Sequence, residues 1–280
     1  MMKKIIVPVD FSEYSENALR TAAFLAKQKE AEVLAVHMLE LSNAVISQSE
    51  SAVQQEMVFY LKLAEKRFNE FLQKEYLSDV KVTPIIKHFK IFSELDDLAK
   101  NEEADLIIMG SKGVGGVKEI LVGSNTEKVI RHAHVPVLVI KEEPIASKIE
   151  KVLFACDFSD EDVEPYMKAK KFFKNLDAKI EILYVSTPNS KFKSSKELED
   201  RMMHFFNQTD EKHQDSIPKV KMVSDYSVEK GVFYYANKEN SDILVVATHG
   251  RKGITHFFEG SISEDIANHS KLPVLSFKVQ

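Results

Sequence analysis

Several classes of protein are excluded by what this 280-residue sequence lacks. It has a single cysteine, Cys156, so no disulfide can form within the chain, and such usage fits a reducing, intracellular compartment. No apolar stretch approaches the ~20 residues that cross a bilayer, and the apolar run before Asp10 is too short for the core of a signal peptide. We therefore expect a cytoplasmic protein without a membrane partner.

An excess of positive charge is also lacking. The formal net charge of -5 gives no reason to expect nucleic acid or an anionic membrane surface as the main partner. The composition, 44% hydrophobic and 29% charged, is typical of a soluble globular protein. A chain of 280 residues is long enough for two domains that each bury a core.

The sequence contains an internal repeat, which decides its organisation. The segments Lys4–Ser12, KIIVPVDFS, and Lys151–Ser159, KVLFACDFS, both consist of an apolar run that ends in Asp-Phe-Ser. Further blocks match in the same order, among them ADLIIMGSKG from Ala104 and SDILVVATHG from Ser241. The second copy is the shorter one between its second and fourth strands. Four matched blocks in one order establish a tandem duplication.

Each copy alternates short apolar runs, rich in β-branched residues, with segments of helical spacing. Near-continuous apolar strands separated by helices are typical of a parallel sheet covered on both faces. We expect strands at 4–9, 33–38, 80–87, 106–109 and 137–140, and in the second copy at 151–156, 180–185, 220–224, 243–247 and 274–277. The sequence thus predicts an α/β protein with one domain over 1–143, a second over 149–280, and a linker at 144–148. Each domain is a five-stranded, parallel-type sheet flanked by helices.

Glycines follow the fourth predicted strand of the first copy. Gly110, Gly113 and Gly123 precede Ser124 at the start of a predicted helix. Glycine lets backbone N–H groups approach an anion closely, and a helix N-terminus favours phosphate. In an open parallel sheet, ligands bind at the carboxyl ends of the strands. The sequence therefore predicts a nucleotide-phosphate loop.

With this spacing, Gly-x2-Gly-x9-Gly-Ser, the sequence resembles a tandem member of the universal stress protein (UspA) family. The opening VPVDFSEYSENAL and the segment HVPVLVI are also similar to that family's first and last strands. The resemblance covers nearly the whole chain. It implies two tandem Rossmann-like domains of the adenine nucleotide alpha hydrolase-like kind, and a stress-response or signalling module that binds ATP or AMP, with or without Mg²⁺.

The resemblance also implies which residues hold the nucleotide. Around the adenine it places Pro8, Val9, Asp10 and Met38, with Gly110 at the ribose. It assigns the phosphate contacts to Gly113, Gly123, Ser124, Asn125 and Thr126. The same strand and loop supply Met109, Ser111 and Lys112 as further candidates, of which the lysine either reaches a phosphate or is simply solvated.

The second copy departs from this pattern. Ala247 stands where the first glycine is expected, and Glu259 is one of three carboxylates around the proposed anion site, where like charge weakens phosphate binding. Arg251 and Lys252 offset part of that charge. The candidate contacts in this copy are Asp157, Val185, Gly250, Gly260 and Ser261. We therefore expect the nucleotide to be bound mainly by the first copy.

Several alternatives stay open from the sequence. Asp10 and Asp157 could cap the helices that follow them, contact the ligand, or both. No catalytic residue and no metal site is assigned, because no P-loop or Rossmann fingerprint is present and His132 and His134 have no third ligand nearby. The chain could instead be a scaffold with a vestigial loop, or a slow ATPase in which Asp10 faces a metal.

The last strand of each copy, at 136–140 and 273–277, is a candidate edge strand that needs covering. The two copies could cover each other as an intramolecular pseudo-dimer, and two such chains could then form a homodimer.

Overall fold

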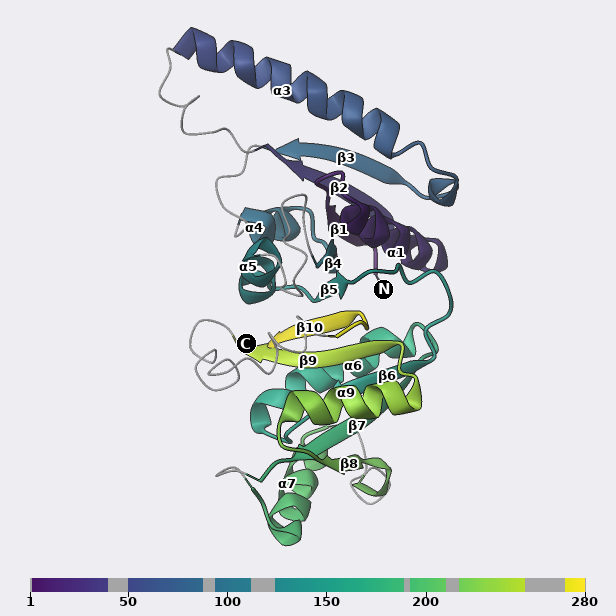
Figure 1. Cartoon of the computed structure of the whole chain (residues 1–280), viewed down its shortest axis with the longest axis vertical. Helices are drawn as coiled ribbons and strands as arrows, with labels where there is room; N and C mark the ends of the chain where they lie inside the picture. The colour runs from purple at the N-terminus through teal and green to yellow at the C-terminus, as the bar shows by residue number, and fades with distance from the viewer. Residues whose placement is uncertain are drawn as a thin grey trace. The chain divides into compact units, whose positions relative to one another are not determined.

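The computed structural model describes residues 2–39, 50–87, 94–111, 124–188, 192–209, 217–249 and 270–279 (Figure 1). The chain divides into two compact units, with the division between Ser147 and Lys148. Each unit is an α/β fold with a parallel sheet, as the sequence predicts. Within the described ranges, no helix has both the length and the apolar composition of a membrane span.

The sheet of the first unit has five parallel strands in the order β3-β2-β1-β4-β5. Its strands are β1 (Lys4–Pro8), β2 (Glu32–Met38), β3 (Val82–Lys87), β4 (Leu106–Gly110) and β5 (Val137–Ile140). Its helices are α1 (Glu13–Lys29), α3 (Glu50–Phe71), α4 (Glu94–Asn101) and α5 (Ser124–His132), with a 3-10 turn η1 (Glu75–Leu77) after α3.

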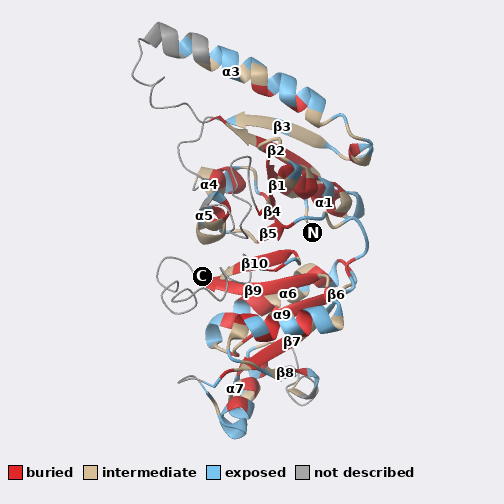
Figure 2. Cartoon of the chain, viewed as in Figure 1, coloured by how far each residue is buried: buried red, intermediate tan, exposed pale blue. Residues whose placement is uncertain are grey.

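Both faces of this sheet are buried. Alternate strand residues such as Ile6 and Ile107 pack with Leu95 of α4 and Val129 of α5 in one hydrophobic cluster. Ile5, one position away and therefore on the opposite face, is also fully buried. Figure 2 shows β1, β2, β4 and β5 as mostly buried and the edge strand β3 as intermediate, whereas much of α3 is exposed. This two-sided burial is why the strands read as continuous apolar runs.

Local sequence signals fix the first helix. Ser12 is the N-cap of α1, since its hydroxyl accepts the backbone N–H of Ser15. Acidic side chains lie in the first turn and basic ones in the last, in keeping with the helix dipole. Glu30 ends the helix in the left-handed conformation, with φ of 53°.

The second unit repeats the architecture in the order β8-β7-β6-β9-β10, again all parallel. Its strands are β6 (Lys151–Ala155), β7 (Lys179–Ser186), β8 (Lys221–Ser224), β9 (Ile243–His249) and β10 (Val274–Val279). Its helices are α6 (Val163–Lys174), α7 (Ser195–Asn207) and α9 (Val228–Glu239), with 3-10 turns η2 (Asp160–Asp162) and η3 (Ile217–Lys219).

The duplication is visible in individual hydrogen bonds. In the first unit, the Oδ2 atom of Asp105 accepts the backbone N–H groups of Lys3 and Lys4 at 2.6 and 3.1 Å. In the second unit, Asp242 accepts those of Glu150 and Lys151 in the same way, at 2.8 and 2.9 Å. The matched carboxylates therefore tie the start of β1 to β4 and the start of β6 to β9.

Candidate functional site

The strand order of the first unit reverses between β1 and β4. From β1 the chain proceeds outward through β2 to β3, and it then returns to the other side of β1 with β4 and β5. Such a switch point is where open α/β sheets bind ligands, outside the carboxyl ends of the strands. Here it brings together the residues that end β1 and those that end β4. They are Pro8, Val9, Asp10, Met109, Gly110 and Ser111.

The turn after β1 is built around Asp10. Its Oδ1 atom accepts the backbone N–H and the hydroxyl of Ser12 at 3.0 and 2.5 Å. Between them Phe11 has a φ of 64°, in the left-handed region. The helix is capped by Ser12, so Asp10 acts on the cap by orienting Ser12 rather than by capping the helix itself. Contact of Asp10 with a ligand stays a prediction.

The ring of Phe11 is held by aromatic neighbours from β2 and α3. The ring centroids of His37, Phe68 and Phe71 lie 4.6, 5.2 and 5.5 Å from that of Phe11. The guanidinium of Arg67 lies 5.8 Å over the same ring. This packing compensates for the unfavourable backbone conformation at Phe11 and fixes the direction of the Asp10 turn.

Sequence reasoning missed His37. Its Nδ1 atom donates to the carbonyl oxygen of Val9 at 2.7 Å, which links β2 to the end of β1. Burial lowers the pKa of His37 below 6.5, and the Val9 carbonyl opposes this only in part. The imidazole is thus neutral at pH 7. The available signal was a polar residue inside an apolar strand, AVHM.

Gly110 has a packing role beside its predicted one. A Cβ at this position would lie 2.8 Å from the carbonyl carbon, the carbonyl oxygen and the Cβ of Tyr14 in the first turn of α1. Real Cβ contacts are not this short, so glycine is what allows α1 to pack against β4. The carbonyl oxygen of Gly110 accepts the hydroxyl of Thr126 at 3.1 Å, which ties the first turn of α5 to the end of β4.

The predicted ligand contacts therefore differ in their surroundings. Ser111 and Thr126 are 4% and 3% exposed, and Pro8 and Val9 are buried, whereas Asn125 is exposed. Met38 ends β2 and is half-buried. Lys112, Gly113 and Gly123 lie outside the described residues, as do Gly250, Gly260 and Ser261 of the second copy, and of Ser124 only the backbone is described.

In the second unit, the carboxylate that matches Asp10 is Asp157, and it has an additional partner. Asp157 accepts the N–H of Ser159 at 2.8 Å, as Asp10 accepts that of Ser12. However, Asp157 also pairs with Arg201 of α7 at 3.5 Å, and the Nε of Arg201 donates to the carbonyl of Phe158 at 3.4 Å. Arg201 thus lies against Asp157, the carboxylate that matches Asp10, a predicted adenine contact of the first unit. Val185, at the end of β7, is buried.

A buried carboxyl group lies directly behind Asp157. Asp162 is 1% exposed, and its Oδ2 accepts the N–H of Asp157 at 3.0 Å and the thiol of Cys156 at 3.4 Å. Burial, with a smaller contribution from the charge of Asp157, raises the pKa of Asp162 to about 7. Burial also raises the pKa of the Cys156 thiol, so this cysteine is a thiol rather than a thiolate at pH 7.

Comparisons with known proteins identify the family. The sequence pattern of the Universal stress protein family matches residues 1–141 and again residues 148–278. Two relatives from Methanocaldococcus jannaschii, Universal stress proteins MJ0531 and MJ0577, are 33% and 36% identical. Each alignment covers 51% of this chain, and 84% and 97% of the respective relative.

A solved structure reproduces the whole fold. A universal stress protein from Archaeoglobus fulgidus superposes with a TM-score of 0.70 at 22% identity, over 99% of this chain and 96% of that one. This similarity shows the fold, and the two matches of the family pattern show that the chain belongs to the universal stress protein family, as a member with two tandem domains.

Proposed function

We propose that this protein binds an adenine nucleotide, ATP or AMP, at the carboxyl ends of β1 and β4 in the first unit, and acts as a stress-response or signalling module. The observation that carries this proposal is the switch point, where the Asp10 turn, Gly110 and the first turn of α5 come together. The N-terminus of a helix and a glycine-rich loop are both suited to phosphate.

The described contacts suggest which residues of the first unit contact the base and which contact the phosphates. Pro8, Val9 and Met38 provide apolar surface for the base, and Asp10 provides a fixed carboxylate. The hydroxyl of Thr126 is used by the carbonyl of Gly110, so its main contribution is to hold α5 in place. Direct phosphate contact then falls to Asn125 and to the backbone of the loop from Lys112 to Ser124.

In the second unit the same site is less suited to a nucleotide. Arg201 already pairs with the Oδ1 atom of Asp157 at 3.5 Å, so a ligand at that carboxylate must compete with a cation of the protein itself. The sequence adds Ala247 in place of a glycine and Glu259 beside the loop. We infer that one nucleotide binds per chain, in the first unit.

Native mass spectrometry of the purified full chain tests this proposal. We expect one ATP or AMP per chain, with or without Mg²⁺, and its loss in Gly123→Val, because a branched side chain would lie where the phosphates approach. Gly260→Val changes the matched position of the second copy and should keep the nucleotide. An empty parent protein that gives no heat with ATP and Mg²⁺ in calorimetry would instead favour a scaffold function.

A slow ATPase activity of the first unit is a further proposal, and if it needs Asp10 it would be lost in Asp10→Asn. A cytoplasmic location is also a proposal.

The two copies are further proposed to pair as an intramolecular pseudo-dimer. Sedimentation of the full chain beside an isolated first copy tests this pairing. If the first copy alone stays monomeric, internal pairing has no basis.

A further inference from the structure

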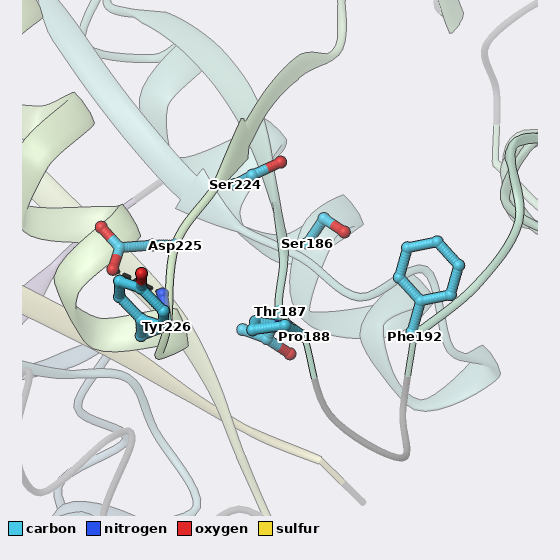
Figure 3. Close-up of a pocket in the computed structure, with 7 residues that line it drawn as sticks. All are labelled: Ser186, Thr187, Pro188, Phe192, Ser224, Asp225 and Tyr226. Carbon is cyan, nitrogen blue, oxygen red and sulfur yellow. Dashed lines mark hydrogen bonds between the residues drawn. The ribbon is translucent and has the colours of Figure 1, made fainter.

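A pocket of about 480 Å³ lies in the second unit, at the carboxyl ends of β7 and β8 (Figure 3). It is lined by Ser186, Thr187, Pro188, Phe192, Ser224, Asp225 and Tyr226. The switch point of this unit lies between β6 and β9, so the pocket lies further out along the sheet, next to Val185, the residue that matches Met38 of the first unit. Its volume is in the range of small-molecule sites, about 300–1,000 Å³.

Two exposed aromatic side chains are among the residues that line the pocket. Phe192 and Tyr226 are 64% and 86% exposed, which is unusual for large apolar side chains. In Figure 3 they lie on opposite sides of Thr187 and Pro188. An exposed ring offers the negative face of its π-system, which attracts a cation.

The polar groups of the pocket have the same preference. Asp225 supplies a carboxylate, and Ser186, Thr187 and Ser224 supply hydroxyls. One oxygen of Asp225, Oδ1, accepts the N–H of Tyr226 at 2.6 Å, which fixes the side chain beside the ring. Among the described residues that line the pocket, none is cationic. A phosphate or carboxylate ligand would therefore meet a like charge without a compensating partner.

The helix N-termini near the pocket do not reverse this preference. The N-terminus of α9 is capped by the hydroxyl of Ser227, which accepts the N–H of Lys230. That of α7 has a full capping box between Ser194 and Glu197. Since these caps already satisfy part of the N–H groups at the helix starts, they reduce the attraction of the termini for an anion.

The lining is also particular to the second copy. In the register of the sheets, Ser186 pairs with Ser224, one position beyond Val185 and Val223. The residues that follow the matched strands of the first copy are Leu39-Glu40-Leu41 and His88-Phe89-Lys90. The serines, Asp225 and Tyr226 are therefore not part of what the two copies share, as residues of a common nucleotide site would be.

We propose that this pocket binds a small organic ammonium ion, with the cation at the ring of Tyr226 and the carboxylate of Asp225, and the rest of the ligand toward Phe192 and the serine hydroxyls. This site is independent of the nucleotide site in the first unit. Binding at such an open site is weak, in the range of about 1–10 mM.

Choline and 3,3-dimethylbutanol are a matched pair of probes, since the second has the shape of choline without its charge. Saturation-transfer NMR on the full chain measures the binding of each. We expect choline to bind about five- to tenfold more tightly than the neutral alcohol. Equal binding of the two, or no transfer to choline at about 20 mM, would overturn the proposal.

Variants locate the site. Tyr226→Leu removes a ring, and Asp225→Asn removes the charge but keeps the acceptor for the N–H of Tyr226. Each should weaken choline binding several-fold. Tyr234→Leu and Asp177→Asn are the controls, because they alter an exposed tyrosine and an exposed aspartate outside the pocket. If the control variants lose as much affinity as the pocket variants, choline binds elsewhere and the assignment is wrong.

Discussion

Tyr14 lies so close to Gly110 that a Cβ on the glycine would be only 2.8 Å from its carbonyl carbon and oxygen. This contact joins the first turn of α1 to the end of β4, at the place where the strand order reverses. A glycine that the family resemblance assigns to the ribose is thus also required by the packing of the protein itself. The two roles have different experimental signatures.

We predict that Gly110→Ala destabilises the first unit by about 1–3 kcal/mol, since the backbone of Tyr14 must move to admit a methyl group. Urea denaturation followed by circular dichroism measures the change. Ala247→Gly is the matched variant of the second unit, where a methyl group is already accommodated. An unaltered unfolding midpoint in Gly110→Ala would mean that α1 shifts freely and that the close contact is not a constraint.

His37 should make the first unit sensitive to acid. Its folded-state pKa is lowered below 6.5, so the unfolded state binds more protons as the pH falls. The stability from neutral His37 is complete above pH 6.5 and is lost as the pH falls through its folded pKa. We expect His37→Asn, which can keep a donor toward Val9, to be less stable at pH 7 but to have a flatter pH dependence.

Thermal unfolding at several values between pH 5 and pH 8 measures this effect, and His204→Asn is the control on an exposed histidine. The same slope in parent and His37→Asn would show that His37 does not carry the acid sensitivity.

Asp162 should act in the opposite direction in the second unit. Its folded pKa is raised from 3.8 to about 7, so the folded state binds the extra proton. The stability from the protonated carboxyl is complete below pH 3.8 and is lost as the pH rises toward 7. Asp162→Asn keeps an oxygen acceptor for the N–H of Asp157 and cannot ionise. Between pH 5 and pH 8 we expect the free energy of unfolding of the variant to rise relative to that of the parent, by on the order of 2–4 kcal/mol.

Asp160→Asn is the matched control, because Asp160 is two residues away but exposed, and hydrogen bonds from Gln208 and His204 lower its pKa. The measurement is the unfolding free energy of the parent and of both variants at pH 5 and at pH 8. A gain for Asp160→Asn as large as that for Asp162→Asn would assign the effect to general charge repulsion.

The fold was predictable because its signal is local. Strands buried on both faces read as apolar runs, and the repetition of those runs gives both the duplication and the α/β class. The surroundings of the site were not predictable, because they depend on tertiary contacts. Nothing in SDEDVEP shows that Asp162 turns inward to Cys156 while Asp160 stays exposed.

Gly110 is a second residue whose tertiary contacts could not be predicted from the sequence. Its place in the glycine pattern was visible in the sequence, but its contact with Tyr14 requires the packing angle of α1 on β4, which no pattern within either segment specifies. Likewise, Arg201 is forty-four residues from Asp157 in the sequence and reaches it only because α7 packs beside the end of β6.

The carboxylates that open the two sheets give the last prediction. Asp105 and Asp242 each accept two backbone N–H groups at the start of the first strand of their unit. Removing the acceptor leaves two donors that only water can satisfy, so Asp105→Ala and Asp242→Ala should each lower the stability of their own unit by about 1–2 kcal/mol. Hydrogen exchange of the Lys4 and Lys151 amides, measured by NMR, reports the two units separately. Because the bonds are equivalent, we expect each variant to speed exchange in one unit and leave the other unchanged. Faster exchange of both amides in either single variant would show that the units do not open independently.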